Sequence, residues 1–295
     1  MEETNIDALL PAQMATRAEY VGVRKAEMPA LRMFMLAVLA GGFIAMGAIF
    51  ATTVAAGAMP VSDSAGKAMY SASLPYGIAR LLAGLVFSLG LILVVVGGAE
   101  LFTGNNLIVM AWASGKVSGR ALLRNWSIVY LGNFVGSIGT AILVLLSRQY
   151  TFGGDAIGVS ALKTAVGKVE LGFIQAIALG ILCNALVCMA IWLTFSARST
   201  IDRILAIVFP IAAFVAAGFE HSVANMYFIP YALLIKQFDP AFLAKVAGQV
   251  PHLDSLTWGA FLLRNLLPVT LGNIIGGAGL VAAVYWAIFL RKRDS

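Results

Sequence analysis

Two glutamates lie in the interior of long apolar stretches of this chain, each in the same short pattern. Glu100 and Glu220 each follow a glycine by two residues and precede an asparagine, Asn105 or Asn225, by five. An acidic side chain in the middle of a membrane span costs about 3 kcal/mol on insertion scales, so it marks a special place. We expect a broken helix at each pattern, with the carboxylates accepting hydrogen bonds from freed backbone amides. Direct contact with a solute is the alternative.

His221 directly follows the second of these glutamates and is one of two histidines in the chain. A lone histidine in an apolar helix is commonly a satisfied core residue. Its place at a predicted helix break, beside an acid, favours a functional role here. An imidazole, whose ordinary pKa is about 6.5, can hold or release a proton in the physiological range.

The composition is that of a polytopic membrane protein. Of 295 residues, 60% are hydrophobic and 12% charged, and the mean hydropathy is +0.90. A helix needs about 20 apolar residues to cross a bilayer. We therefore predict an all-α fold with six transmembrane helices, near 34–56, 78–112, 124–147, 171–196, 202–235 and 262–290. The second and fifth exceed one crossing, and each holds one of the glutamates. No metal-ligand spacing or nucleotide-binding loop is visible, so no metal or cofactor is expected.

Charge places the spans relative to the membrane. If both termini are cytoplasmic, that side holds 12 of the 20 lysines and arginines, as the positive-inside rule favours. The net charge of +6 therefore relates to topology, and no nucleic-acid partner is expected. We divide the chain into an amphipathic cytoplasmic segment (1–32), a six-span domain (33–290) and a basic cytoplasmic tail (291–295). The first segment is expected along the membrane surface or at the mouth of the protein. Whether it gates the protein in response to pH is open.

The two halves of the chain repeat each other. Leu-Leu-Arg-Asn at 122–125 is followed by Leu-Gly-Asn at 131–133, and the same strings recur at 262–265 and 271–273. Each half holds three spans, an odd number, so the second half must be inverted relative to the first. Repeat one covers about 33–147 and repeat two about 171–290. Inverted repeats with broken helices at the membrane midplane are typical of transporters and channels.

Several segments resemble one family of membrane proteins, and in the family's order. They are Asp7–Pro11, Phe87–Leu91, Gly98–Thr103, Gly218–Met226 and Leu266–Asn273. The chain resembles the formate/nitrite transporter family over about residues 7–290, and within it the bacterial formate channels. The resemblance implies an aquaporin-like protomer with its own pore, a homopentamer in the lipid bilayer of the bacterial inner membrane, and formate or a similar small anion as solute.

The resemblance also implies roles for individual residues. Thr103 and His221 would form the central polar pair, and Lys168, Asn184 and Asn273 would guide the anion or lie near the pore. Leu101 and Phe102 would form the cytoplasmic constriction, and Phe87, Leu91 and Phe214 the periplasmic one. His221 would lend a proton to the anion between the constrictions, because a bare carboxylate loses its hydration there at a cost of several kcal/mol. Glu100 stands where some formate channels have Asp, and the loops 148–165 and 238–258 match weakly.

Four other functions remain to be weighed. Nitrite, hydrosulfide, lactate or acetate would suit the same pore chemistry, and a proton-coupled transporter would use the same histidine. An intramembrane enzyme built on Glu220 and His221 lacks a recognised nucleophile motif. An aquaglyceroporin lacks support because neither break carries the sequence Asn-Pro-Ala.

Overall fold

Six helices of the protein are long and apolar enough to cross a membrane. The computed structural model describes residues 8–57, 59–62, 68–72 and 74–291. The six are α2 (Ala30–Ala55), α3 (Tyr76–Gly97), α5 (Gly119–Leu146), α7 (Phe173–Ser196), α8 (Thr200–Ala217) and the run Ala260–Phe289. That run comprises η5 (Ala260–Leu266), α11 (Leu267–Ile274), η6 (Ile275–Ala283) and α12 (Val284–Phe289), of which η5 and η6 have the wider π-helical turn. The prediction of a six-span, mainly α-helical membrane protein is confirmed.

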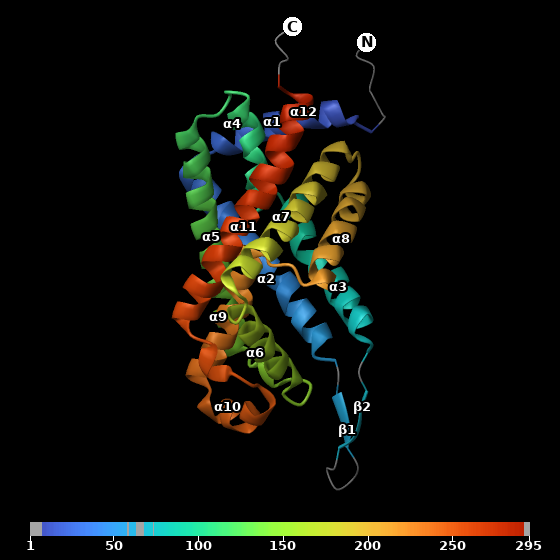
Figure 1. Cartoon of the computed structure of the whole chain (residues 1–295), viewed down its shortest axis with the longest axis vertical. Helices are drawn as coiled ribbons and strands as arrows, with labels where there is room; N and C mark the ends of the chain where they lie inside the picture. The colour runs from blue at the N-terminus through green and yellow to red at the C-terminus, as the bar shows by residue number, and fades with distance from the viewer. Residues whose placement is uncertain (1–7, 58, 63–67, 73, 292–295) are drawn as a thin grey trace.

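The first and last helices lie at the same end of the molecule. Figure 1 shows α1 and α12 at the upper end, and α6, α10 and a small hairpin at the lower end. An even number of crossings accounts for this arrangement. Which end faces the cytoplasm stays a prediction from the charge distribution.

Both predicted breaks are present, each beginning at a glycine in the left-handed conformation. Helix α3 ends at Gly97, Gly98 has a φ of 76°, and helical turns resume at η1 (Gly104–Ile108) and α4 (Val109–Ala113). Helix α8 ends at Ala217, Gly218 has a φ of 77°, and α9 (Ser222–Phe238) follows. A side chain at either glycine would be strained in this region of φ, so glycine suits these positions.

The N-terminal segment packs against the rest of the protein. Helix α1 (Pro11–Ala26) contacts η1, α4 and α7. It buries Met14, Ala18 and Gly22, and a Cβ at Gly22 would lie 3.1 Å from the Cβ of Ala111. The Glu19 carboxylate is buried and forms an ion pair with Lys116. Residues 1–7 and 292–295 of the predicted leader and tail lie outside the described residues.

Short elements occupy the connections that were expected to be loops. The stretch after α5 holds η2 (Gln149–Thr151) and α6 (Ala156–Val169), and the stretch after α9 holds α10 (Pro240–Val246), η3 (Ala247–Gln249) and η4 (Leu253–Ser255). The all-α expectation needs one addition, because β1 (Met59–Ser62) and β2 (Ala68–Ala72) pair antiparallel between α2 and α3, with Val61 opposite Tyr70.

Glycines allow α7 and α11 to approach closely. A Cβ at Gly180 would lie 2.8 Å from the carbonyl oxygen of Val269 and 3.2 Å from the Cα of Gly272. Small residues at such contacts are typical of helices packed in lipid. The close approach also brings the backbone of α7 within reach of Asn273, a residue of α11.

Candidate functional site

The structure brings together the two residues predicted as the central polar pair. Thr103 Oγ1 and His221 Nε2 are 3.0 Å apart, and the two residues are 0% and 3% exposed. Each comes from the break of a different half of the chain. A buried hydroxyl and imidazole therefore meet where the two broken helices face each other.

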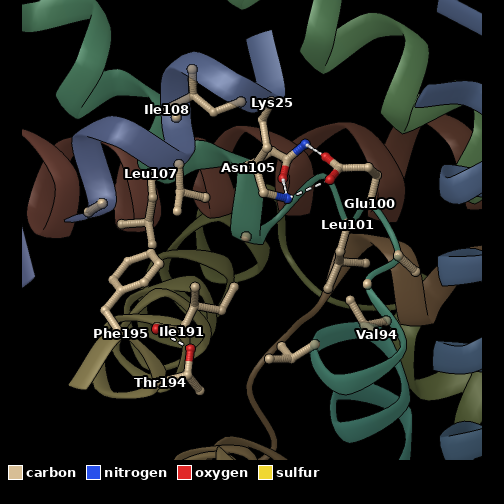
Figure 2. Close-up of a pocket in the computed structure, with 17 residues that line it drawn as sticks. Lys25, Val94, Glu100, Leu101, Asn105, Leu107, Ile108, Ile191, Thr194 and Phe195 are labelled. Carbon is tan, nitrogen blue, oxygen red and sulfur yellow. Dashed lines mark hydrogen bonds and ion pairs between the residues drawn. The ribbon is translucent and has the colours of Figure 1, made fainter. Parts of the chain in front are cut away.

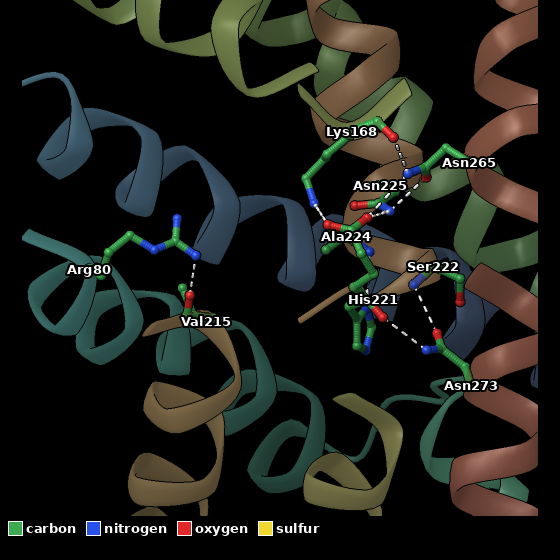
Figure 3. Close-up of polar contacts among 10 residues, drawn as sticks. Arg80, Lys168, Val215, His221, Ser222, Ala224, Asn225, Asn265 and Asn273 are labelled. Atoms are coloured by element: carbon green, nitrogen blue, oxygen red, sulfur yellow. Dashed lines mark hydrogen bonds and ion pairs between the residues drawn. The ribbon is translucent and has the colours of Figure 1, made fainter. Parts of the chain in front are cut away.

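The backbone around His221 fixes the state of its ring. His221 is the N-cap of α9, and its Nδ1 accepts a hydrogen bond from the backbone N–H of Ala224 at 3.0 Å (Figure 3). A nitrogen that accepts carries no proton, so the neutral ring holds its hydrogen on Nε2 and donates it to Thr103. Adding a second proton to the ring requires the Ala224 amide to be released.

One cavity lies on the α6 side of the central pair. It has a volume of about 90 Å³, and its lining includes Phe87, Phe214, His221, Lys168 and Arg80. The Phe214 ring stacks on the His221 ring with centroids 5.9 Å apart, and the Phe87 ring meets the Phe214 ring edge-on at 5.7 Å. We call this the outer cavity. Two of the three residues predicted for the periplasmic constriction line it.

Leu91, the third residue of that predicted constriction, lies one turn of α3 beyond Phe87. It is 1% exposed and belongs to the main hydrophobic core. Leu91 does not line the outer cavity, and its role in the periplasmic constriction stays a prediction.

A second cavity lies on the α1 side of the central pair. It has a volume of about 240 Å³, and Lys25, Glu100, Leu101 and Asn105 are part of its lining (Figure 2). We call this the inner cavity. Leu101 lines this cavity, and its role in the cytoplasmic constriction stays a prediction.

Phe102 has a different environment from its neighbour Leu101. Its ring packs edge-on against the rings of Tyr130 and Trp126, with centroids 4.9 Å and 6.0 Å away. Its backbone N–H donates to Oδ1 of Asn133 at 2.9 Å. The structure thus separates the two residues that the resemblance grouped in one constriction.

Each glutamate at a break accepts hydrogen bonds from side chains, not from the freed backbone amides that we predicted. Glu100 accepts from Lys25 Nζ and from Asn105 Nδ2, both at 2.8 Å (Figure 2). Asn105 Nδ2 also donates to Asn125 Oδ1 at 2.9 Å, and Asn125 Nδ2 donates to the carbonyl oxygen of Lys25 at 3.1 Å. The structural role stands, but the donors are a lysine and an asparagine.

The second half repeats most of this network, but it has no counterpart of the bond from Lys25 Nζ to Asn105 Oδ1 at 2.9 Å, because Asn225 Oδ1 has no hydrogen-bond partner among the described residues. Glu220 accepts from Lys168 Nζ at 2.6 Å and from Asn225 Nδ2 at 2.7 Å. Asn225 Nδ2 donates to Asn265 Oδ1 at 2.7 Å, and Asn265 Nδ2 donates to the carbonyl oxygen of Lys168 at 2.9 Å (Figure 3). Lys168 is therefore bound by a carboxylate at the outer cavity, and Lys25 is its counterpart at the inner one.

Two further asparagines bind the freed backbone at the breaks. Asn133 accepts from the N–H of Phe102, and Asn273 accepts from the N–H of Ser222, both at 2.9 Å. Asn184, predicted as an anion guide, donates to the carbonyl oxygens of Asn273 and Thr103, at 2.7 Å and 3.3 Å. All three asparagines are fully buried. They position the backbone that carries the central pair.

Four residues of these networks were not predicted as site residues from the sequence: Lys25, Asn125, Asn133 and Asn265. Three of them stand in the repeated Leu-Leu-Arg-Asn and Leu-Gly-Asn strings, so the repeat itself could have identified them. Lys25 carries no such signal. Its contact with Glu100 depends on how α1 lies against the second break.

The fold and the site define an integral membrane transport protein, with two cavities on either side of a buried polar pair between broken helices. The chain belongs to the formate/nitrite transporter family, whose model matches residues 12–287. It is 44% identical to the formate channel FocA of Escherichia coli K12 over 289 residues, which cover 98% of this chain and 97% of that one. It is 38% identical to FocA of Haemophilus influenzae, with 92% and 91% covered.

Solved structures agree with this assignment. A pentameric formate channel with formate bound matches with a TM-score of 0.79 and 44% identity, covering 89% of this chain and 98% of that one. An FNT family ion channel matches with a TM-score of 0.72 and 27% identity, covering 94% and 98%. These relatives are channels and transporters, so this chain is not an enzyme and the alternative of an enzyme at Glu220 and His221 is not supported.

Proposed function

We propose that this protein is a membrane channel that passes formate through a pore in each protomer. Relatives that match nearly the whole chain are named formate channels. The observation that carries the proposal is the buried pair Thr103–His221, 3.0 Å apart, between two cavities that each hold a lysine. Two hydrogen-bonding groups in an apolar surrounding suit one small anion with few atoms to solvate.

The path runs from one cavity to the other through the central pair. In the outer cavity, formate meets Lys168 and passes the rings of Phe87 and Phe214. On the inner side it passes Leu101 and meets Lys25. Burying an anion without partners is costly, so the groups that it meets between these points decide the rate. Leu91 and Phe102 support the constrictions by packing behind them.

At the midpoint we propose that formate accepts hydrogen bonds from His221 Nε2 and from the Thr103 hydroxyl. The neutral ring, capped by Ala224, is the donor in this arrangement. Lending a proton to formate needs a second proton on the ring, and therefore release of the Ala224 amide. Proton transfer is thus coupled to movement at the first turn of α9. Asn184 and Asn273 hold the backbone on both sides of the pair.

For the assembly we propose a homopentamer in the bacterial inner membrane, with both termini in the cytoplasm. A matching solved structure is pentameric. The excess of lysine and arginine on one side supports the orientation. In this orientation the inner cavity faces the cytoplasm, the outer cavity faces the periplasm, and α1 is part of the cytoplasmic vestibule.

The test is flux through the purified protein in liposomes, with formate, nitrite and hydrosulfide compared below and above about pH 6.5, the ordinary pKa of histidine. We expect preferential passage of formate with a rate that depends on pH. Equal passage of the three anions would contradict formate selectivity while leaving the channel. Flux that requires a proton gradient would favour a proton-coupled transporter, and no flux of any anion would contradict the channel itself.

A further inference from the structure

Arg80 lies on the wall of the outer cavity and contacts the break of the second half. It belongs to the second turn of α3 and lines the cavity with Lys168. Its Nε donates to the carbonyl oxygen of Ala216 at 3.4 Å, and its Nη2 donates to the carbonyl oxygen of Val215 (Figure 3). Both acceptors belong to the last turn of α8, just before Gly218. Arg80 therefore links α3 to the end of the broken helix.

The charge of Arg80 is not neutralised by these contacts. Backbone carbonyls carry only partial charge, and Arg80 forms no ion pair within the part of the chain that the structure describes. Lys168 and Lys25, by contrast, each pair with a buried carboxylate, at 2.6 Å and 2.8 Å. A paired lysine contributes little net field to its cavity. The unneutralised cation of the outer cavity is thus Arg80.

The two cavities differ in net charge for this reason. The charged residues that line the inner cavity are Lys25 and Glu100, which cancel. The charged residues that line the outer cavity are Arg80 and Lys168. Glu220 forms an ion pair with Lys168 and not with Arg80. The repeat places Glu100 opposite Glu220, a spacing of 120 residues, so the counterpart of Arg80 is the uncharged Thr200. The second half has no cation at that position, although Arg198 and Arg203 stand within three residues of it.

We propose that Arg80 is a specificity-determining residue that gives the outer cavity its affinity for small monovalent anions. The proposal rests on the function proposed above. A cavity with apolar walls and charge of one sign raises the local concentration of the opposite ion. Formate reaching Phe87 and Phe214 is therefore drawn in by Arg80, while Lys168 chiefly neutralises Glu220.

The experiment compares three variants with the wild-type protein. Arg80→Gln removes the charge, Arg80→Lys keeps the charge but loses the forked donation to two carbonyls, and Arg148→Gln is the matched control. Arg148 is an exposed cation that pairs with Asp239 at 3.3 Å. Formate uptake into liposomes is measured against formate concentration at neutral pH, at ionic strengths of about 0.05 M and about 0.5 M, because salt screens an exposed field. Melting temperature and oligomeric state establish that each variant folds.

At low ionic strength, Arg80→Gln should raise the half-saturating formate concentration by about three- to tenfold, as for loss of one unscreened charge near the ion. The difference should shrink at high ionic strength. Arg80→Lys should stay near the wild type, and so should Arg148→Gln.

Two results would overturn the inference while wild-type flux is normal. One is an Arg80→Gln variant whose half-saturating formate concentration at low ionic strength equals that of the wild type. The other is an equal, salt-independent loss in Arg80→Gln and Arg80→Lys, which would make Arg80 a cap for α8 alone. Wild-type protein that passes no formate, nitrite or hydrosulfide would contradict the proposed function and this inference with it.

Discussion

Asn133 and Asn273 make the same three backbone hydrogen bonds in the two halves of the chain. Asn133 Nδ2 donates to the carbonyl oxygens of Ala37 and Glu100 at 2.8 Å and 2.9 Å. Asn273 Nδ2 donates to those of Gly180 and Glu220 at the same two distances. The side-chain oxygen of each asparagine also accepts from a backbone N–H, that of Phe102 or Ser222. Each side-chain amide therefore satisfies three backbone groups at a break. Each asparagine thereby holds a transmembrane helix and a broken segment in one position.

Replacing either asparagine should destabilise the protein strongly. In Asn273→Ala, buried backbone groups of Gly180, Glu220 and Ser222 lose their partners, at about 1–3 kcal/mol for each group left unsatisfied. We expect a large fall in melting temperature, measured in detergent, and a similar fall for Asn133→Ala. Leu131→Ala is the control, because Leu131 is 60% exposed. Wild-type melting of Asn273→Ala would show that the backbone at the break finds other partners.

The pair Lys168–Glu220 should behave as one unit in a double-mutant cycle. Its side chains are 16% and 5% exposed, so either group alone would be a poorly solvated charge. Lys168→Met and Glu220→Gln should each cost about 3 kcal/mol, and the double variant should cost much less than their sum. Unfolding of the wild type and the three variants in detergent measures the coupling. Additive losses would mean that water solvates both groups.

His221→Asn and His221→Ala should separate the cap from the proton chemistry. Asparagine is a good N-cap, so His221→Asn can still accept from the Ala224 amide, whereas His221→Ala should lose about 1 kcal/mol with the cap. We expect wild-type melting for His221→Asn, with reduced formate flux that no longer depends on pH. A normal pH profile in this variant would remove His221 from proton transfer.

Acid stability should depend on Asp239, at the end of the molecule that holds α10. A hydrogen bond from the Tyr150 hydroxyl, at 2.7 Å, lowers the pKa of the Asp239 carboxyl, and the Phe242 amide and Arg148 act in the same direction. Because the pKa is lower in the folded state, the ionised Asp239 carboxylate stabilises the folded protein, and this stabilisation is complete above the ordinary pKa of aspartate. It is lost as the pH falls through the folded-state pKa.

Tyr150→Phe removes the main cause of that shift. The pKa of Asp239 should rise towards its ordinary value, so the variant should be less stable than the wild type at neutral pH and should lose less stability on acidification, with the two melting temperatures converging at low pH. Melting temperature as a function of pH measures this. The same dependence of melting temperature on pH in the two proteins would contradict a role for the Tyr150–Asp239 bond.

The spans and the breaks could be predicted from the sequence because membrane spans and broken helices leave local signals. An apolar run of sufficient length marks a span, and Gly-x-Glu inside such a run marks a break at Gly98 and Gly218. The meeting of Thr103 with His221 came from the family resemblance, since it joins residues 118 positions apart.

Other features depend on packing that no local pattern encodes. The partner of Glu100 is Lys25 because α1 lies against η1, and the sequence alone allowed α1 to lie on the membrane instead. Phe102 turns to Tyr130, away from Leu101, because consecutive side chains in an irregular segment need not share a direction. Most of helix α6 was expected to be part of a weakly matching loop, 148–165, and Lys168 lies in its last turn.

The matched networks of the two halves bear on the symmetry of the centre. Lys25 and Lys168 lie just outside the repeats at 33–147 and 171–290, so each network needs the helix that precedes its repeat, α1 or α6. With a spacing of 120 residues, His221 corresponds to Leu101, and Thr103 corresponds to Val223. The frame is nearly symmetric, while these central positions differ between the halves. A pair of identical chains would present two copies of each group, so a centre with one hydroxyl and one imidazole requires two different halves in one chain.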